Sequence, residues 1–234
     1  MRKVISDNVV VDDRCSFFND VYQEIIKKYP FTITYKDGKL VLLHKKMSLV
    51  QVVDDANDRR MYKGMMYKYA NHCKSQYGAV DIDVEKLNAD VMFNCECLHK
   101  FSNKYPMFFG YNDKNDVVGL FGFRKSITLK TRDGEEVNLQ EISTRTNLEN
   151  NTGLAIYGGI AFFMLYAYAM KNNTEVFMST VRFLRSAMFR ASEMCKYSYL
   201  TTCKRYVDVF NSDIVLDLWT THQDEYIQNL LMQS

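Results

Sequence analysis

The sequence contains little proline, and it lacks the runs of proline, glycine and serine that usually mark a flexible linker. Only 2 of its 234 residues are proline. No internal repeat is present, and charges of both signs are mixed along the chain without a long block of either. These absences predict one domain, or one domain with an extension, that is long enough to bury a proper core.

The chain also has almost no net charge, because 30 Lys and Arg residues against 28 Asp and Glu give +2. Such a balance provides no bulk attraction for nucleic acid or for an anionic membrane. Arg59, Arg60 and Lys63 would share one side of a helix with Tyr67 nearby, an arrangement on which bases could stack. A solvated helix face explains this group better in a nearly neutral chain. We therefore expect no nucleic-acid partner.

Six cysteines occur without a recognisable signal peptide. They predict reduced thiols in a cytosol-like compartment. Lys, Asn, Tyr and Phe are abundant, as is typical of proteins encoded by AT-rich viral or phage genomes. The expected location is therefore cytoplasmic, which means the host cytoplasm or the virion if the protein is viral.

Cysteine and histidine lie close together at two places, which suggests a zinc site. On the predicted helix, however, Cys95 and His99 share a face while Cys97 points elsewhere, so the three cannot hold one ion. His72 and Cys73 lie upstream, but the paired CxxC spacing of zinc sites is absent. Cysteines in helices are usually small buried hydrophobic residues. We expect no metal.

The first 48 residues predict a strand, a helix and a hairpin. Residues 3–11 are apolar and β-branched, as in a strand, and residues 14–28 have the periodicity of an amphipathic helix. Asp37-Gly38 favours a two-residue turn, so residues 31–44 predict a hairpin. We expect residues 1–48 to be an N-terminal extension of the main domain. Its apolar positions should be mostly buried against the core: Phe17, Val21, Ile25 and Leu42.

Residues 49–234 form the second predicted unit, and its centre is a strand-helix-strand-helix run. Strands are predicted at 137–144 and 175–181, with a long apolar helix at 154–171 between them. A helix of this length between two strands predicts a right-handed crossover that places them parallel in one sheet. The polar loop at 147–153 would leave free backbone N–H groups at the start of that helix, where a phosphate can bind.

Other elements surround this centre. They are a strand at 49–53, helices at 54–76, 84–104 and 182–195, a hairpin at 107–111 and 117–123 that extends through Ile127 and Leu129, and a closing strand pair at 199–210 and 214–219.

The helix at 154–171 raises the question of a membrane span. Residues 154–170 contain no charged side chain. A span needs about 20 apolar residues, so this stretch is slightly short. Gly158, Gly159 and the tyrosines indicate a helix buried in protein on both sides, and we expect no membrane contact.

The order of these elements and four stretches of sequence resemble the GNAT acyl-CoA N-acyltransferase superfamily. The resemblance implies an α/β fold: a GNAT-like mixed sheet with a central β-α-β-α unit, preceded by an N-terminal α+β extension. It also implies that the two central strands separate near their carboxyl ends. Glu141–Arg145 is further similar to the acyl-homoserine-lactone synthase branch. The four stretches are similar to the third strand, the fourth strand, the pyrophosphate loop and the fifth strand: Val118–Phe123, Val137–Ser143, Asn150–Ala155 and Thr174–Thr180.

This resemblance implies an acyl-CoA-dependent N-acyltransferase that moves an acyl group to an amine, with acetyl-CoA or another acyl-CoA as cofactor. Two features depart from the family pattern. Asn150 stands where Gln or a basic residue is usual. The helix at 182–195 has no tyrosine to protonate the leaving thiolate, and Tyr197 and Tyr199 lie just beyond it. The residues implied to bind the cofactor are Ser143, Asn150, Asn151, Thr152, Gly153, Leu154 and Ala155.

The chemistry independently indicates a base. Acyl transfer requires that the attacking amine lose a proton. Glu141 lies among apolar strand residues, where burial would raise its pKa and make it a suitable base. Alternatively, Glu141 faces solvent or pairs with Arg145, since ion pairs also perturb carboxylates. Asn151-Thr152 likewise has a second interpretation as an ordinary helix N-cap that needs no ligand.

A second hypothesis is a non-catalytic structural or interaction protein that keeps this fold, such as a virus or phage component. The two departures favour it, as does the apolar central helix, which could bury a partner surface. The expected partners are thus acyl-CoA with an unidentified amine acceptor, or another protein or second copy of the chain.

Overall fold

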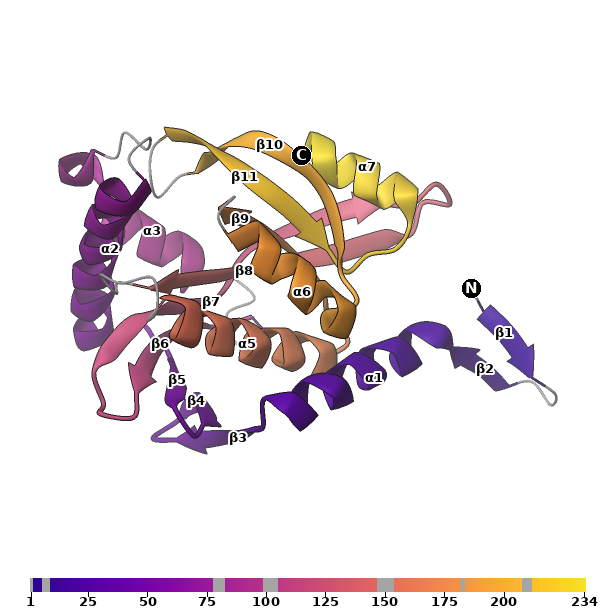
Figure 1. Cartoon of the computed structure of the whole chain (residues 1–234), viewed down its shortest axis with the longest axis horizontal. Helices are drawn as coiled ribbons and strands as arrows, with labels where there is room; N and C mark the ends of the chain where they lie inside the picture. The colour runs from indigo at the N-terminus through magenta and orange to yellow at the C-terminus, as the bar shows by residue number, and fades with distance from the viewer. Residues whose placement is uncertain are drawn as a thin grey trace.

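The structure is a computed structural model of the chain, and it describes residues 2–5, 9–77, 83–98, 105–146, 154–181, 184–207 and 212–234. A nine-stranded mixed sheet forms its centre, with helices on both faces (Figure 1). In sheet order the strands are β10 (Ser198–Val207), β11 (Ser212–Thr220), β9 (Glu175–Val181), β8 (Glu136–Thr146), β7 (Val117–Lys130), β6 (Met107–Asn112), β5 (Met47–Gln51), β4 (Lys39–His44) and β3 (Phe31–Lys36).

The helices form two layers. One face of the sheet is covered by α1 (Asp13–Lys28), α5 (Gly159–Lys171) and α6 (Arg185–Cys195). The other face carries α2 (Ala56–Tyr77) and α3 (Ala89–Glu96) at one end, and α7 (Glu225–Gln233) at the other. Two short helices complete the description: η1 (Val84–Lys86), and the π-helical turn η2 (Leu154–Gly158), which leads directly into α5.

The central crossover has the predicted geometry. β8 and β9 are parallel neighbours with the register Leu139↔Glu175 and Glu141↔Phe177, and η2 and α5 connect them. The closing strands pair as expected, and β11 lies between β9 and β10, antiparallel to both. The architecture predicted from the sequence is confirmed: an α/β fold with a mixed sheet built around a β-α-β-α unit.

The N-terminal residues join this architecture at two places. The hairpin β3–β4 turns at Asp37-Gly38, where both φ angles are positive, and extends the main sheet through β5. Helix α1 packs on α5 and α6. The predicted apolar face is inward: Val21, Ile25 and Leu42 are buried, while Phe17 is partly buried.

Two predicted elements differ from the structure. Residues 3–11 do not form one strand but parts of two, β1 (Arg2–Ile5) and β2 (Val9–Asp12), which pair with each other in a separate sheet beyond the start of α1 (Figure 1). The polar Ser6-Asp7-Asn8 interrupts the apolar run between them. The helix expected at 84–104 is shorter in the structure, because η1 occupies Val84–Lys86 and α3 covers only Ala89–Glu96. The Asn88 side chain caps the start of α3 by accepting from the Val91 N–H at 3.1 Å.

A pair of glycines explains one of the family-like stretches. Gly110 in β6 lies opposite Gly119 in β7, and the Phe121 ring packs over both. A Cβ on Gly110 would lie 2.2 Å from that ring, and one on Gly119 would lie 2.2 Å from the Arg145 carbonyl oxygen. The early glycine in Val118–Phe123 is therefore required by packing beside β8.

Candidate active site

The pairing of β8 with β9 stops half-way along both strands. The last pair is Glu141↔Phe177, yet β8 continues to Thr146 and β9 to Val181. Within the described residues, no pair joins segment 142–146 to segment 178–181, which we call the unpaired ends. Each unpaired end keeps its other neighbour, β7 for β8 and β11 for β9. This loss of pairing agrees with the predicted separation of the two strands.

Glu141 lies at the point where the strands part. It is only 9% exposed, and β7 has a register shift opposite it, between Phe123 and Ser126. Side chains alternate along a strand, so Glu141 shares the face of Leu139, which packs in the cluster under α7, and not that of Ile142, which packs under α5. The carboxylate is therefore buried on the α2/α3/α7 face, and the alternative that it faces solvent is wrong.

Arg145 does not pair with Glu141 either. Its guanidinium makes a two-point interaction with Glu96 of α3: Nη1 donates to Oε2 at 2.8 Å and Nη2 to Oε1 at 2.5 Å. Both residues are 3% exposed. The interpretation of Glu141 as a partner of Arg145 is thus corrected. Among the described residues, no hydrogen bond or ion pair reaches the Glu141 carboxylate, so its oxygens remain available as acceptors.

Two further donors converge on Glu96. The Tyr62 hydroxyl of α2 donates to Oε2 at 2.5 Å, and Arg124 Nε of β7 donates to Oε1 at 3.1 Å. We call Glu96, Tyr62, Arg124 and Arg145 the Glu96 cluster. Burial alone would raise the pKa of Glu96, but attraction to Arg145 and its hydrogen bonds, helped by Arg124, outweigh burial and lower that pKa. Glu96 is therefore ionised and fully compensated.

The sequence reasoning missed this cluster, although one signal was present. Glu96 follows Met92 and Phe93 at helical spacing, which places a carboxylate on the buried face of α3. A carboxylate at a core position needs a cation and hydrogen-bond donors. The sequence could have indicated that Glu96 has a buried basic partner, but not which arginine it is.

The predicted cofactor-binding residues are only partly described. Asn150, Asn151, Thr152 and Gly153 lie outside the described residues. Ser143 lies in the unpaired end of β8 and is partly buried. The backbone of Leu154 and Ala155 begins η2, which contacts β8. Ser143 thus lies on the same strand as Glu141, and η2 contacts that strand.

Thr146, the last residue of β8, has an unusual environment. It is 1% exposed, and its hydroxyl has no hydrogen-bond partner within the described part of the chain. An unsatisfied buried hydroxyl costs about 1–3 kcal/mol, so such groups are rare in folded proteins unless a ligand or water completes them. This hydroxyl, next to the predicted cofactor loop, is the structural observation that fits a bound ligand.

The tyrosines beyond α6 do not supply an acid near Glu141. The Tyr197 hydroxyl donates to the Met188 carbonyl at 2.7 Å, and burial raises the pKa of Tyr197. Tyr199 shares a hydrogen bond of 2.8 Å with Thr202. Both rings pack on Trp219 in the layer of α6, on the opposite face of the sheet from Glu141. The departure from the family pattern at this position therefore persists in the structure.

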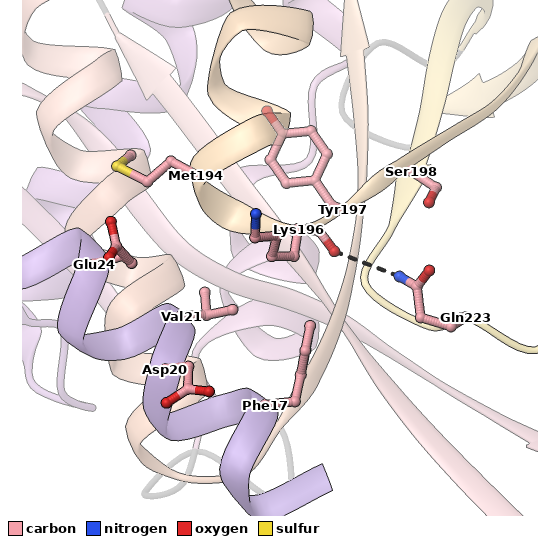
Figure 2. A pocket seen from close by; sticks show the side chains of 9 residues that line it. All are labelled: Phe17, Asp20, Val21, Glu24, Met194, Lys196, Tyr197, Ser198 and Gln223. Carbon is pink, nitrogen blue, oxygen red and sulfur yellow. Dashed lines mark hydrogen bonds between the residues drawn. The ribbon is translucent and has the colours of Figure 1, made fainter. Parts of the chain in front are cut away.

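A separate cavity of about 510 Å³ lies between α1 and the connection from α6 to β10 (Figure 2). Asp20 and Glu24 of α1 and Lys196 are among the residues that line it, and Gln223 Nε2 donates to the Lys196 carbonyl at 3.4 Å. Because α1 and α6 cover the face opposite Glu141, this cavity is not part of the Glu141 site. The remaining lining residues are Phe17, Val21, Met194, Tyr197 and Ser198.

The basic stripe on α2 is paired with its own surroundings. Arg59 Nε donates to Asp54 at 2.7 Å, and Lys63 lies 3.6 Å from Asp90. Arg60 donates to the Asn57 side chain. Each of these basic side chains therefore contacts a neighbouring acidic or amide side chain, as on a solvated helix face.

The cysteines that were considered as zinc ligands do not form a common site in the described part of the chain: Cys95 is exposed, whereas Cys73 and Cys97 are buried. Cys73 and Cys97 are buried among apolar side chains, and burial raises the pKa of Cys73 to about 12. His99 lies outside the described residues. Within the described part, no group of three or more His, Cys, Asp or Glu residues is placed to hold a metal ion. No helix there is long and apolar enough to cross a membrane.

The chain is similar in fold to several solved structures that are described as acetyltransferases. A Bordetella pertussis protein described as a GnaT-family acetyltransferase is 14% identical with a TM-score of 0.49, over 78% of this chain and 99% of that one. A Streptococcus agalactiae acetyltransferase is 14% identical with a TM-score of 0.48, over 76% and 99%. The microcin C7 self-immunity acetyltransferase MccE, solved with acetyl-CoA and AMP, is 8% identical with a TM-score of 0.49, over 76% and 92%. No protein-family model and no curated protein matches the sequence significantly. At this level the similarity does not extend to substrate or activity.

Proposed function

We propose that this protein is an acyl-CoA-dependent N-acyltransferase. The observation that carries the proposal is the end of β8–β9 pairing at a buried glutamate, with both strands continuing unpaired beyond it. Free strand edges bind extended, amide-containing ligands through backbone hydrogen bonds, as in β-strand addition. The arm of acyl-CoA that carries the thioester is such a ligand.

The residues present fit this cofactor in part. The unpaired ends would hold the amide-bearing arm, and Ser143 and the unpartnered Thr146 hydroxyl would add side-chain hydrogen bonds. Asn150, Asn151, Thr152 and Gly153, with the backbone of Leu154 and Ala155, remain the residues proposed for the pyrophosphate. When bound, acyl-CoA supplies an activated acyl group with a thiol as leaving group.

Glu141 is the proposed base. Its carboxylate would accept the proton that the amine nitrogen loses on bonding to the acyl carbon. Two properties support this role: it lies where the strands part, and no group in the described residues occupies its oxygens. The acceptor is an amine whose identity stays open, as does the length of the acyl chain.

Binding and transfer can be tested separately. Acetyl-CoA at about 100 times its dissociation constant should stabilise the wild-type protein by about 2.7 kcal/mol, which thermal denaturation detects readily. Gly153→Val should abolish this stabilisation, because a side chain there would intrude where backbone must approach a pyrophosphate. Glu141→Gln should keep it while slowing acyl transfer at least 100-fold.

A matched control for Glu141 lies on the same strand. Glu136 is exposed at the other end of β8, so Glu136→Gln should change neither binding nor transfer. A wild-type protein whose melting temperature is unchanged by millimolar acetyl-CoA would contradict the proposed function.

That outcome would favour the second candidate, a non-catalytic structural or interaction protein, including a viral or phage component. The observation on its side is that Tyr197 and Tyr199 are engaged in structural hydrogen bonds away from Glu141. Its partner would be another protein or a second copy of the chain. A cytoplasmic location remains the expectation for both candidates.

A further inference from the structure

The unpaired ends of β8 and β9 pose a physical problem. Backbone N–H and C=O groups beside the protein interior are normally paired, and closing the two strands into a continuous parallel ladder would pair them. The strands are already in register up to Glu141 and Phe177, so closure would only extend an existing ladder. Interactions with other parts of the protein therefore have to favour the separated arrangement over this closed one.

Arg145 ties the unpaired end of β8 to the helices through a buried ion pair. Its bidentate contact with Glu96 joins β8 to α3, and a contact of 3.6 Å with the Met66 sulfur adds α2. Arg124 attaches β7, the remaining neighbour of this segment, to the same carboxylate. The Glu96 carboxylate on α3 is thereby bonded to β7 through Arg124 and to β8 through Arg145.

The ionic character of this contact is informative. Buried ion pairs are weak evidence for stability, because apolar residues of similar volume often do as well. A two-point arginine–carboxylate contact differs from apolar packing in that it fixes both the distance and the orientation of the two partners. Such a contact is suited to hold one strand in place against a competing alternative.

We propose that Glu96 and Arg145 are positioning residues that keep the unpaired end of β8 away from β9. The assignment of the unpaired ends to acyl-CoA rests on the proposed function, whereas the holding role itself does not. Neither residue needs to touch the ligand. Their removal should let β8 and β9 close, which would exclude an extended ligand from between them.

The test replaces three of the four residues of the Glu96 cluster by apolar residues of similar size, Glu96→Leu, Arg145→Met and Tyr62→Phe together, and leaves Arg124 in place. Hydrogen exchange is measured on the ligand-free protein by mass spectrometry, for peptides that cover residues 142–146 and 178–181. Acetyl-CoA binding is measured by calorimetry. We expect a folded variant whose amides in these segments exchange at least tenfold more slowly and whose acetyl-CoA affinity is at least tenfold lower.

A folded triple variant with wild-type exchange and wild-type affinity would overturn the proposal, as would faster exchange across the whole sheet, which reports only general destabilisation. If the triple variant does not fold, Arg145→Lys keeps the charge but loses the two-point contact. Slower exchange in the same segments then supports the proposal, and unchanged exchange overturns it.

A control variant is Lys39→Met, which breaks a 2.7 Å ion pair with the buried Asp58 between β4 and α2. It should leave exchange at the unpaired ends unchanged. If wild-type protein does not bind acetyl-CoA, the proposed function fails, but the exchange comparison still decides whether Glu96 and Arg145 hold the strands apart.

Discussion

The two halves of β8 are built on different physical principles. The amino-terminal half has β7 on one side and, from Leu139, β9 on the other, and it buries Val137 and Leu139 in an apolar cluster with Phe177 and α7. The carboxyl-terminal half, beyond Glu141, has one strand neighbour and is mostly polar, ending in Arg145 and Thr146. The first half is organised for stability, and the second is held open by directional contacts.

This contrast predicts how each half responds to substitution. Apolar burial is tolerant of small changes in orientation, so losing it should weaken the whole fold without altering the unpaired ends specifically. A directional ion pair is intolerant of losing one partner, because the other charge is left buried.

The largest effect is expected for Arg145→Met. Glu96 would lose its two-point partner while remaining buried, which costs about 3–5 kcal/mol in the free energy of unfolding. Urea denaturation followed by circular dichroism measures this change. Adding Glu96→Leu to the same protein should restore part of the loss, because the buried carboxylate is then gone while Arg124 loses its contact with that carboxylate. An Arg145→Met protein as stable as the wild type would show that the Arg145–Glu96 ion pair does not contribute to stability.

In the amino-terminal half, Leu139→Ala should cost about 3 kcal/mol, because Leu139 is 0% exposed and the cavity left behind cannot fully collapse. Acetyl-CoA affinity of the folded fraction should remain at the wild-type level. Leu129→Ala, at a partly buried position on the preceding strand β7, provides a control with a smaller loss. A large drop in affinity for Leu139→Ala would break the proposed division between the two halves.

The third prediction concerns acid. The pKa of Glu96 is lowered in the folded protein, mainly because Arg145 outweighs the effect of burial. Its contribution to stability is therefore fully present above the unfolded-chain pKa of about 4.3 and is lost as the pH falls through the folded pKa. For one such group the free energy of unfolding declines by at most about 1.4 kcal/mol per pH unit.

Urea denaturation at a series of pH values from about 3 to about 7 should show that the free energy of unfolding declines below about pH 4.3. The Glu96→Leu/Arg145→Met protein should show a shallower decline over the same range. Equal slopes in the two proteins would mean that other carboxylates dominate acid unfolding.

Much of the fold could be predicted because its signals are local. Asp37-Gly38 predicted a hairpin turn, and the helix at 154–171, which is charge-free up to Met170 and lies between two strand-like runs, predicted a parallel crossover. The errors also have local causes: Ser6-Asp7-Asn8 divided an apparent strand, and Asn88 capped a helix later than its apolar pattern suggested.

The candidate site was less predictable because its decisive contacts are between distant residues. The position of Glu141 in an apolar strand indicated burial correctly, but the partner of Arg145 is 49 residues away in sequence. No periodicity in β8 alone could distinguish Glu96 from Glu141 as that partner. The proposed catalytic and cofactor roles remain predictions.

The smallest effect is expected at the end of the carboxyl-terminal half. Thr146→Val replaces the unpartnered buried hydroxyl by a methyl group of nearly the same size. If nothing in the free protein satisfies that hydroxyl, its removal should raise the free energy of unfolding by about 1 kcal/mol. If the hydroxyl serves a bound cofactor, the same change should weaken acetyl-CoA binding about tenfold, the equivalent of one hydrogen bond. Thermal denaturation with and without acetyl-CoA measures both.

Thr144→Val, at a partly buried position on the same face of β8, is the control and should change neither quantity by a comparable amount. A variant that gains stability and keeps its affinity would show that Thr146 lies outside the cofactor site, whereas opposite signs in the two measurements would place its hydroxyl at the cofactor.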